Sequence, residues 1–205
     1  MTIVVIDYGM GNLHSVSKAL ETAGAEVLVS SDPRDLAAAE RIVLPGVGSF
    51  AQGIKHLNES GFAEQLTKEV MDKGKPFLGI CLGMHLAAAF GEEGGGNRGL
   101  GWIEGEVIQF KAAGIKVPHM GWDDVKFVNG SPLFSGLKSP GTLYFVHSYH
   151  FVPKDEKVVA GVCDYGGDFV AAIRRDNIHL VQFHPEKSQQ SGLRILENFI
   201  SMKDG

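Results

Sequence analysis

The sequence predicts an α/β fold, namely an open, mostly parallel β-sheet flanked by helices, with an antiparallel extension in the second half of the chain. In the first half, short β-branched runs alternate with segments whose apolar residues recur at helical spacing. In the second half, extended segments follow one another across short gaps, as in an antiparallel sheet. Because neither an internal repeat nor a low-complexity linker interrupts the chain, residues 1–205 are expected to form a single domain.

The first half contains the elements of the parallel sheet. Short apolar runs bounded by glycine or proline predict four strands, at Ile3–Tyr8, Val27–Val29, Arg41–Leu44 and Phe77–Ile80. Helical spacing or a start signal predicts helices between them, at residues 13–23, after Asp32-Pro33, through residues 62–70, and over Leu82–Phe90. In Asp32-Pro33, the aspartate is the expected N-cap and the proline the first helical residue.

A glycine-rich stretch, EEGGGNRGLG at residues 92–101, separates the two halves. The extended segments that follow it are EVIQF, KVPHMGW, DVKFV, LYFVHSYHFV, VVAGVC, FVAAIRR and IHLVQFH. Their β-branched and aromatic residues are typical of strands. A helix near Ser191–Met202 is expected to close the chain, because its apolar residues fall on one face.

Composition excludes several functional classes. The chain is 44% hydrophobic and 21% charged, with a formal net charge of −5, and no basic cluster exceeds the pair Arg174–Arg175. This argues against nucleic-acid binding. No apolar run approaches the ~18 residues of a membrane span, and the N-terminus lacks the basic region of a signal peptide. The two cysteines, Cys81 and Cys163, cannot form a disulfide scaffold, so a cytoplasmic protein with reduced thiols is expected.

Cys81 lies in the motif GICLG, at an expected strand-to-helix junction. A nucleophile between two glycines is typical of a sharp turn that lifts its side chain above the sheet. The positive end of the following helix favours a thiolate, and the N–H of Leu82 is placed to stabilise an oxyanion. The alternative is a small buried core residue, which is also how we interpret Cys163.

His184 and Glu186 lie in QFHPEKS, at the end of an expected strand. In an extended backbone, residues i and i+2 project to the same face, so the carboxylate can orient the imidazole and stabilise its protonated form. The pair could therefore serve as the base for a Cys81 nucleophile, since both would lie at strand C-termini of one sheet. A solvated turn at the strand end is the alternative.

A third glycine-containing turn, PGVGSF at Pro45–Phe50, also follows a strand. The glycines on either side of Val47 let backbone N–H groups approach a ligand, although a turn without a ligand would use the same residues. The joint occurrence of this loop, the cysteine turn and the HPE segment is far more specific than any one of them.

The chain resembles the class I glutamine amidotransferases, and within them the glutaminase subunits of imidazole glycerol phosphate synthase. Six segments carry the resemblance, in the family's order: DYGMGN, PGVGSF, GICLGM, PHMGW, YFVHSY and QFHPEKS. The resemblance implies a flavodoxin-like fold. It also implies that Cys81 attacks the side-chain amide of L-glutamine, that His184 transfers protons, and that Glu186 orients His184. No cofactor and no metal is implied.

The resemblance also implies binding residues. The oxyanion would be stabilised by the N–H of Leu82 and by an N–H of the loop that contains Val47 and Gly48. Positions that match glutamine contacts in the family are Gly46, His85, Glu93, Ser148 and Tyr149. In the absence of the resemblance, Glu92 and Glu93 would be interpreted as solvated charges.

A partner protein is implied as well. Members of the family pass ammonia to a (β/α)8 cyclase subunit, which makes imidazole glycerol phosphate and a carboxamide by-product of the purine pathway (AICAR) in histidine biosynthesis. Trp122, Tyr144 and Lys187 match positions near that heterodimer interface. Core packing is the alternative for the two aromatic residues.

Three positions depart from the family pattern: His85 replaces a usual Gln, Asp123 a usual Asn and His150 a usual Tyr. His85 can still offer a donor and an acceptor to a substrate, or it is a tolerated substitution. A metal at His147 and His150 is disfavoured, because neither has a Cys or carboxylate partner at ligand spacing.

Three other functions remain compatible with these departures. The chain could supply ammonia to a different synthase, for example one that amidinates surface sugars. It could be a non-catalytic binding subunit that lost glutamine binding through His85. It could also be a cysteine hydrolase unrelated to glutamine, which the PHMGW and HSY segments disfavour.

Overall fold

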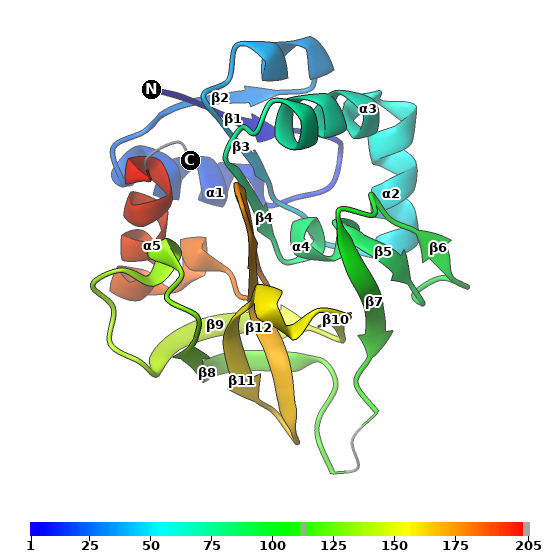
Figure 1. The fold of residues 1–205 in the computed structure, drawn as a ribbon, viewed down its shortest axis with the longest axis vertical. Coiled ribbons are helices and arrows are strands. Elements are labelled where there is room, and N and C mark those ends of the chain that lie inside the picture. The colour runs from blue at the N-terminus through cyan, green and yellow to red at the C-terminus, as the bar shows by residue number, and fades with distance from the viewer. Residues whose placement is uncertain (112–113, 203–205) are drawn as a thin grey trace.

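The computed structural model describes residues 1–111 and 114–202, and it has the expected α/β architecture (Figure 1). The strands are β1 Thr2–Ile6, β2 Glu26–Ser30, β3 Arg41–Leu44, β4 Phe77–Ile80, β5 Ala88–Gly91, β6 Asn97–Arg98, β7 Ile103–Gln109, β8 His119–Phe127, β9 Gly141–His147, β10 Tyr149–Pro153, β11 Val159–Asp164, β12 Asp168–Arg175 and β13 Ile178–Val181. The α-helices are α1 Leu13–Thr22, α2 Phe50–Glu59, α3 Phe62–Leu66, α4 Leu82–Leu86 and α5 Gln189–Ser201.

The strands form one mixed sheet. Its order is β2-β1-β3-β4-β13-β12-β10-β7-β5-β6, and β11 extends it sideways from β12 to β8 and β9. The five strands from β2 to β13 in that order are parallel to one another. The pairs beyond them are antiparallel except for β5 with β7, as the sequence predicted for the second half. The carboxyl ends of β1, β3, β4 and β13 therefore meet at one edge.

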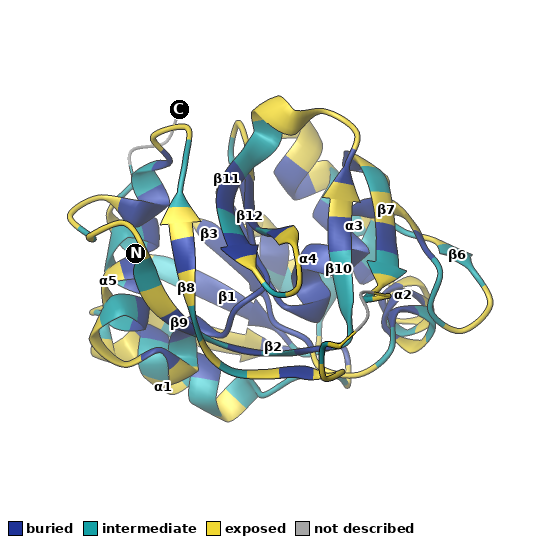
Figure 2. Ribbon diagram, turned by 90° about the horizontal axis from the view of Figure 1, so that it is seen from below, coloured by how far each residue is buried: buried dark blue, intermediate teal, exposed yellow. Residues whose placement is uncertain are grey.

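Helices cover both faces of the parallel strands. One core cluster joins alternate residues of β1 and β3, such as Val4 and Ile42, to α2, α3 and α4. The other joins the intervening residues, such as Ile3 and Val43, to α1 and α5. The helices lie on opposite sides in Figure 1, and Figure 2 shows the buried parallel strands between them. This arrangement explains why every residue of β3 and β4 is buried.

Several predicted elements need correction. The helix expected over Leu82–Phe90 ends at Leu86, and Ala88–Gly91 is the strand β5. The carbonyl of Ala87 accepts the N–H groups of Trp102 and Ile103 at 3.0 and 3.1 Å, so it does not continue a helix. The alanine run favours helix by propensity, but the tertiary pairing of β5 with β7 overrides it.

Other differences are smaller. The segment after Asp32 is a short 3-10 helix, Pro33–Ala37, in which the Asp32 side chain accepts the N–H of Arg34 as an N-cap. KVPHMGW and DVKFV, expected as two segments, contribute to the single strand β8. LYFVHSYHFV, expected as one, divides at Ser148 into β9 and β10, which occupy different places in the sheet.

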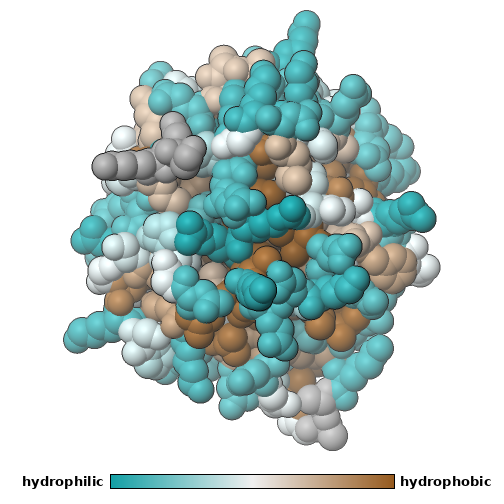
Figure 3. Space-filling model, in the orientation of Figure 1, coloured by the Kyte–Doolittle hydropathy of each residue, from teal (hydrophilic) through white to brown (hydrophobic). Residues whose placement is uncertain are grey.

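One face of the molecule mixes polar and apolar side chains (Figure 3). Figure 3 shows this for the face of Figure 1, where polar side chains surround apolar ones near the centre of the view. Among the described residues, no helix is long and apolar enough to cross a membrane.

Candidate active site

Cys81 stands at the junction between β4 and α4, with a backbone φ of 53° and ψ of −106°. A positive φ is uncommon for a residue with a side chain, so this turn stores strain where the sequence places the nucleophile. The flanking glycines are required by neighbouring backbone. A Cβ at Gly79 would lie 2.7 Å from the carbonyl oxygen of Gly83, and a Cβ at Gly83 would lie 1.9 Å from that of Leu44.

His184 follows β13, which is paired directly with β4, so the imidazole and the cysteine stand at the ends of adjacent strands. Nδ1–H of His184 donates to Oε1 of Glu186 at 2.8 Å, and both side chains are almost fully buried. The predicted pairing is present, but Pro185–Lys187 form a 3-10 turn instead of continuing the strand.

The charge state of His184 follows from its neighbours. Burial alone would lower its pKa, but the side chains of Cys81 and Glu186 outweigh burial and raise the pKa to about 9. Nε2 has no hydrogen-bond partner among the described residues. The imidazole is therefore held by Glu186 on one side and has its other nitrogen available for proton transfer, with the Cys81 thiol close enough to affect its pKa.

A buried serine that the sequence analysis missed supports His184. The hydroxyl of Ser188 donates to the carbonyl of His184 at 2.7 Å and accepts the N–H of Tyr144 at 3.0 Å. The N–H of His184 in turn donates to the carbonyl of Tyr144 at 2.8 Å. These bonds connect the HPE turn to β9. Ser188 is the last residue of the segment QFHPEKS, but no feature of the sequence around it distinguishes it from a serine on the surface.

A cavity of about 410 Å³ opens beside the thiol of Cys81. Its lining includes eight of the predicted site residues, namely Val47, Gly48, Cys81, Leu82, His85, Glu93, Ser148 and Tyr149. The remaining lining residues, Ser49, Pro118, Val146 and His147, were not predicted. Gly46 lies just outside this cavity, against Leu82 and the hydroxyl of Tyr8. The break at Ser148 between β9 and β10 brings the HSY segment to the cavity wall.

The predicted glutamine contact Glu93 is anchored by the backbone. One carboxylate oxygen accepts the N–H of Phe50 at 2.7 Å, at the first residue of α2. The positive end of that helix favours a carboxylate. The anchor places a negative charge on the cavity wall, opposite in sign to the α-amino group of an amino acid.

The predicted oxyanion donor Leu82 is engaged elsewhere. Its N–H donates to the carbonyl of Gly46 at 3.4 Å, a long bond near the limit of hydrogen bonding. The glycine allows this close approach, because a Cβ at Gly46 would lie 2.8 Å from the Cβ of Leu82. The loop that contains Gly46 and the turn at Leu82, which were predicted to form an oxyanion hole, are therefore adjacent. The N–H of Leu82 is already hydrogen-bonded.

The three departures from the family pattern lie around one group of histidines. Nδ1 of His147 donates to the carbonyl of Tyr149, and Nε2 of His147 lies 2.9 Å from Nδ1 of His119. Nε2 of His119 lies 3.1 Å from Oδ2 of Asp123. His85 and His150 each contribute to lowering the pKa of His147, although burial contributes most. Among the described residues, no group of three or more His, Cys, Asp or Glu side chains is arranged to hold a metal ion.

The three predicted interface residues form a surface cluster of their own. The rings of Trp122 and Tyr144 meet edge to face with centroids 5.8 Å apart, and Nζ of Lys187 lies 5.7 Å from the centroid of Tyr144. Trp122 is 46% exposed, and Met120, two residues before it on β8, is 62% exposed. At this exposure Trp122 is not packed in the core, which was the alternative for it.

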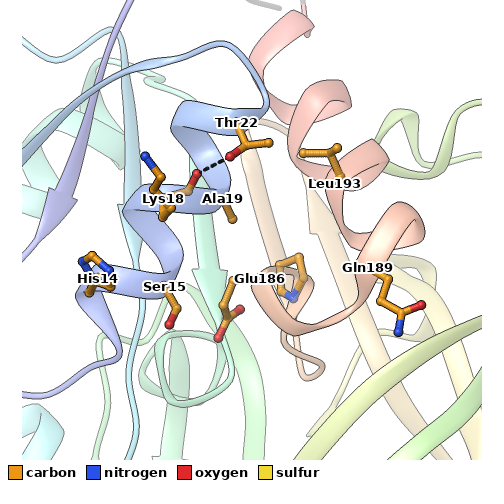
Figure 4. A pocket seen from close by; sticks show the side chains of 9 residues that line it. His14, Ser15, Lys18, Ala19, Thr22, Glu186, Gln189 and Leu193 are labelled. Carbon is orange, nitrogen blue, oxygen red and sulfur yellow. Dashed lines mark hydrogen bonds between the residues drawn. The ribbon is translucent and has the colours of Figure 1, made fainter.

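A second cavity lies behind Glu186 (Figure 4). It is about 450 Å³ in volume and is bounded by α1 and the start of α5. His14, Ser15 and Gln189 are among its lining residues, and Oε2 of Glu186 has no hydrogen-bond partner among the described residues. None of the predicted substrate residues lines this cavity.

Comparison with known proteins identifies the family. The family model for class-I glutamine amidotransferases matches residues 4–202. The imidazole glycerol phosphate synthase subunit HisH of Aquifex aeolicus is 52% identical, with 97% of this chain and 96% of that one covered. The HisH subunit of Syntrophotalea carbinolica is 49% identical, with 98% and 100% covered.

Solved structures agree on the fold. PurLQS from Thermotoga maritima matches with a TM-score of 0.75 at 19% identity, with 97% of each chain covered. The glutaminase domain of Trypanosoma brucei CTPS matches with a TM-score of 0.69 at 17% identity, covering 98% of this chain and 92% of that one. The family model and the curated relatives together show that the chain belongs to the class I glutamine amidotransferases, within the group of HisH subunits of imidazole glycerol phosphate synthase.

Proposed function

We propose that this chain is the glutaminase subunit of an imidazole glycerol phosphate synthase of histidine biosynthesis, and that Cys81, His184 and Glu186 are its catalytic residues. The observation that carries the proposal is the strained Cys81 turn beside the buried His184–Glu186 pair, at the wall of a cavity of about 410 Å³. A cysteine hydrolase for another substrate is less well supported, because the HisH relatives match over nearly the whole chain.

The first half of the reaction breaks the amide bond of glutamine. The pKa of His184, raised to about 9, lets its Nε2 hold the proton of Cys81, and the thiolate sulfur attacks the side-chain carbonyl carbon to form a tetrahedral oxyanion. His184 then returns the proton to the amide nitrogen as the C–N bond breaks. Ammonia leaves, and a γ-glutamyl thioester remains on Cys81. Glu186 keeps the imidazole in the tautomer with a free Nε2 and stabilises the protonated ring.

The second half releases glutamate. Water attacks the thioester carbonyl while His184 accepts its proton, and the resulting oxyanion collapses to expel the sulfur. The proton passes back to the sulfur, which regenerates the thiol of Cys81 and leaves one glutamate and one ammonia for each glutamine and water consumed. No cofactor takes part in these steps.

The cavity wall offers groups suited to the amino-acid end of glutamine. Glu93 presents a carboxylate to the α-amino group, while Ser148 and Tyr149 present hydroxyl and backbone groups to the α-carboxylate. Gly46 and His85 complete the proposed substrate set. Burial raises the pKa of Tyr149, with Glu93 and Glu92 adding to the effect, so its phenol stays protonated as a donor at neutral pH.

Oxyanion stabilisation requires a change in the loop of Gly46. We assign the oxyanion donors to the N–H of Leu82 and to N–H groups of Val47 and Gly48. The N–H of Leu82 must first leave the Gly46 carbonyl, and a 3.4 Å bond resists this only weakly. Val47 is 43% exposed, so a protein bound over the loop could drive the rearrangement. The isolated chain is therefore expected to hydrolyse glutamine slowly, and a bound partner to accelerate it.

The partner is a (β/α)8 cyclase subunit that uses the ammonia, and the two form a heterodimer. Ammonia released into water is protonated and loses its nucleophilicity, so delivery across an interface preserves it. The exposed Met120 and the cluster of Trp122, Tyr144 and Lys187 are the proposed docking surface. Both cysteines are free thiols, which supports a cytoplasmic location, and residues 1–205 are proposed to form one glutamine amidotransferase domain.

The test is glutamate release from glutamine by the chain alone and by the chain with its cyclase partner and the nucleotide substrate of that partner. Release is expected to rise with the partner and to vanish in Cys81→Ala. Trp122→Ala is expected to raise the partner concentration needed for half-maximal activation. Val152→Ala, which truncates another side chain that is 43% exposed, serves as the matched control. Undiminished release by Cys81→Ala would contradict the proposed chemistry.

A further inference from the structure

The sulfur of Cys81 has a polar neighbour that the proposed mechanism does not use. Nε2 of Gln182 donates a hydrogen bond to Sγ of Cys81 at 3.8 Å. The thiol of Cys81 donates in turn to the carbonyl oxygen of Val146 at 4.0 Å. Gln182 is fully buried and stands two residues before His184 on the same strand end. Both residues follow β13, which is paired with β4, and both side chains interact with Cys81, the amide through this bond and the imidazole through the raised pKa of His184.

His85 determines which end of that amide faces the sulfur. Nε2 of His85 lies 2.6 Å from Oε1 of Gln182, in a contact between two buried side chains. An amide oxygen only accepts hydrogen bonds, so the histidine nitrogen must be the donor. With its oxygen engaged by His85, the amide of Gln182 presents its NH₂ group to Cys81.

The contact also keeps His85 in one protonation state. Burial lowers the pKa of His85 to about 4, with the bond to Gln182 opposing and His150 adding to the effect. At neutral pH the ring therefore carries a single proton, and the bond to Gln182 places that proton on Nε2.

We propose that Gln182 is a further catalytic residue, which donates an amide N–H to the thiolate of Cys81, and that His85 is a positioning residue that holds the amide in this orientation. The inference rests on Cys81 being the nucleophile of the proposed function. The opposite orientation of the amide would set its oxygen against the sulfur, an arrangement that suits a thiol and repels a thiolate. His85 thus acts on the sulfur through Gln182, which extends the role predicted for it from the sequence.

Ionisation of the thiol leaves this arrangement intact. The proton passes from Sγ to Nε2 of His184, and no bond of Gln182 is made or broken. The thiolate keeps the N–H donor that already faces the sulfur, and it loses only the long contact to the Val146 carbonyl. A preorganised donor of this kind stabilises charge without reorganisation.

Other titratable groups also face the sulfur. His184 stands after β13 with Glu186 behind it, and the phenol of Tyr8 follows β1. His147 and Glu93 line the cavity next to Cys81. All of these groups are retained when Gln182 or His85 is substituted. A change in the ionisation of Cys81 in such variants therefore reports on the Gln182 amide and the His85 ring.

The experiment is the pH dependence of alkylation of Cys81 by iodoacetamide in the full chain, followed by peptide mass spectrometry. A charge-assisted hydrogen bond of this length corresponds to about one pH unit. Gln182→Met is therefore expected to move the midpoint of the profile up by about one unit, and His85→Leu to move it in the same direction. His85→Gln is expected to keep the wild-type midpoint, because its amide N–H can also donate to Oε1.

The double variant decides whether His85 acts through Gln182. Adding His85→Leu to Gln182→Met is expected to produce no further shift, since the amide is already absent. An unchanged midpoint in Gln182→Met would overturn the role of the amide, and fully additive shifts would overturn the role of His85. Gln182→Glu matches the native side chain in size and turns an oxygen toward the sulfur, so its midpoint should rise even if Gln182→Met folds poorly.

Alkylation does not involve glutamine, which separates this inference from the proposed function. If the variants show these shifts but the wild-type protein releases no glutamate with its partner, the proposed function alone is contradicted. Wild-type protein that releases glutamate while its variants show no shifts would contradict the inference alone.

Discussion

Gly83→Ala is the substitution whose effect follows most directly from the geometry of the cysteine turn. A Cβ at residue 83 would lie 1.9 Å from the carbonyl oxygen of Leu44 and 3.0 Å from its carbonyl carbon. Side-chain carbons do not approach other atoms more closely than about 3.0 Å, so α4 and the end of β3 must separate by about 1 Å. The obstacle is backbone, which cannot turn aside as a flexible side chain can.

The expected magnitudes follow from this displacement. Overpacking against a rigid neighbour costs up to about 3 kcal/mol, and alanine in place of glycine in a helix returns up to about 1 kcal/mol. The free energy of unfolding should therefore fall by about 2 kcal/mol. The same movement shifts Cys81 relative to His184, and a misplacement of about 1 Å in a catalytic group reduces kcat/KM by about 10²-fold.

Urea unfolding and glutamate release with the cyclase partner measure the two effects. Gly53→Ala is the matched control, because it is also a glycine within a helix and its Cβ would meet only the side-chain ends of Leu82 and Leu86, at 3.1 to 3.2 Å. That variant should remain close to wild type in both assays. Wild-type stability and activity in Gly83→Ala would refute the steric explanation of the GICLG motif.

Further substitutions test the surroundings of the imidazole. Burial would lower the pKa of His184, but Cys81 and Glu186 raise it to about 9. The protonated ring therefore stabilises the folded state. This contribution to the free energy of unfolding should be complete below about pH 6.5, the pKa of histidine in the unfolded chain, and should be lost as the pH rises toward 9. Glu186→Gln should weaken this pH dependence of unfolding and reduce kcat/KM by roughly 10²- to 10⁴-fold. Ser188→Ala removes the hydroxyl that accepts the Tyr144 N–H and should lower the unfolding free energy by about 1–3 kcal/mol in urea. Burial lowers the pKa of His119, and the carboxylate of Asp123 partly opposes this effect. Asp123→Asn should therefore lower the pKa of His119 further in an NMR titration. An unchanged pKa would exclude the contact between His119 and Asp123 in solution.

The parallel half of the fold could be predicted from sequence because each of its strands is a short apolar run with a glycine or proline near its end. Arg41–Leu44 and Phe77–Ile80 agree with β3 and β4 at both ends. The prediction for the alanine-rich segment after Leu86 was wrong because its local preference for helix competes with pairing to a strand more distant in the sequence. Ser148 divides two strands within a continuous β-forming run, and neither glycine nor proline marks the division.

The candidate site could be predicted where the residue types in a motif imply a particular backbone geometry. Glycines on both sides of Cys81 imply close backbone approach, and the distances from Gly79 and Gly83 agree with that reasoning. The contact of His85 with Gln182 joins residues 97 positions apart, so sequence patterns could not predict it. The hydrogen bond from the Leu82 N–H to the Gly46 carbonyl depends on the loop conformation, so it could not be predicted from the sequence either.

The central claim is that Cys81 carries the acyl group of glutamine during the reaction. The most direct measurement is the mass of the Cys81 peptide after rapid acid quenching of the complex of this chain and its cyclase partner during turnover of glutamine. A γ-glutamyl adduct on that peptide, removed by hydroxylamine and absent in Cys81→Ala, is the predicted result. Steady glutamate production with no adduct on Cys81, and with activity retained in Cys81→Ala, would contradict the claim.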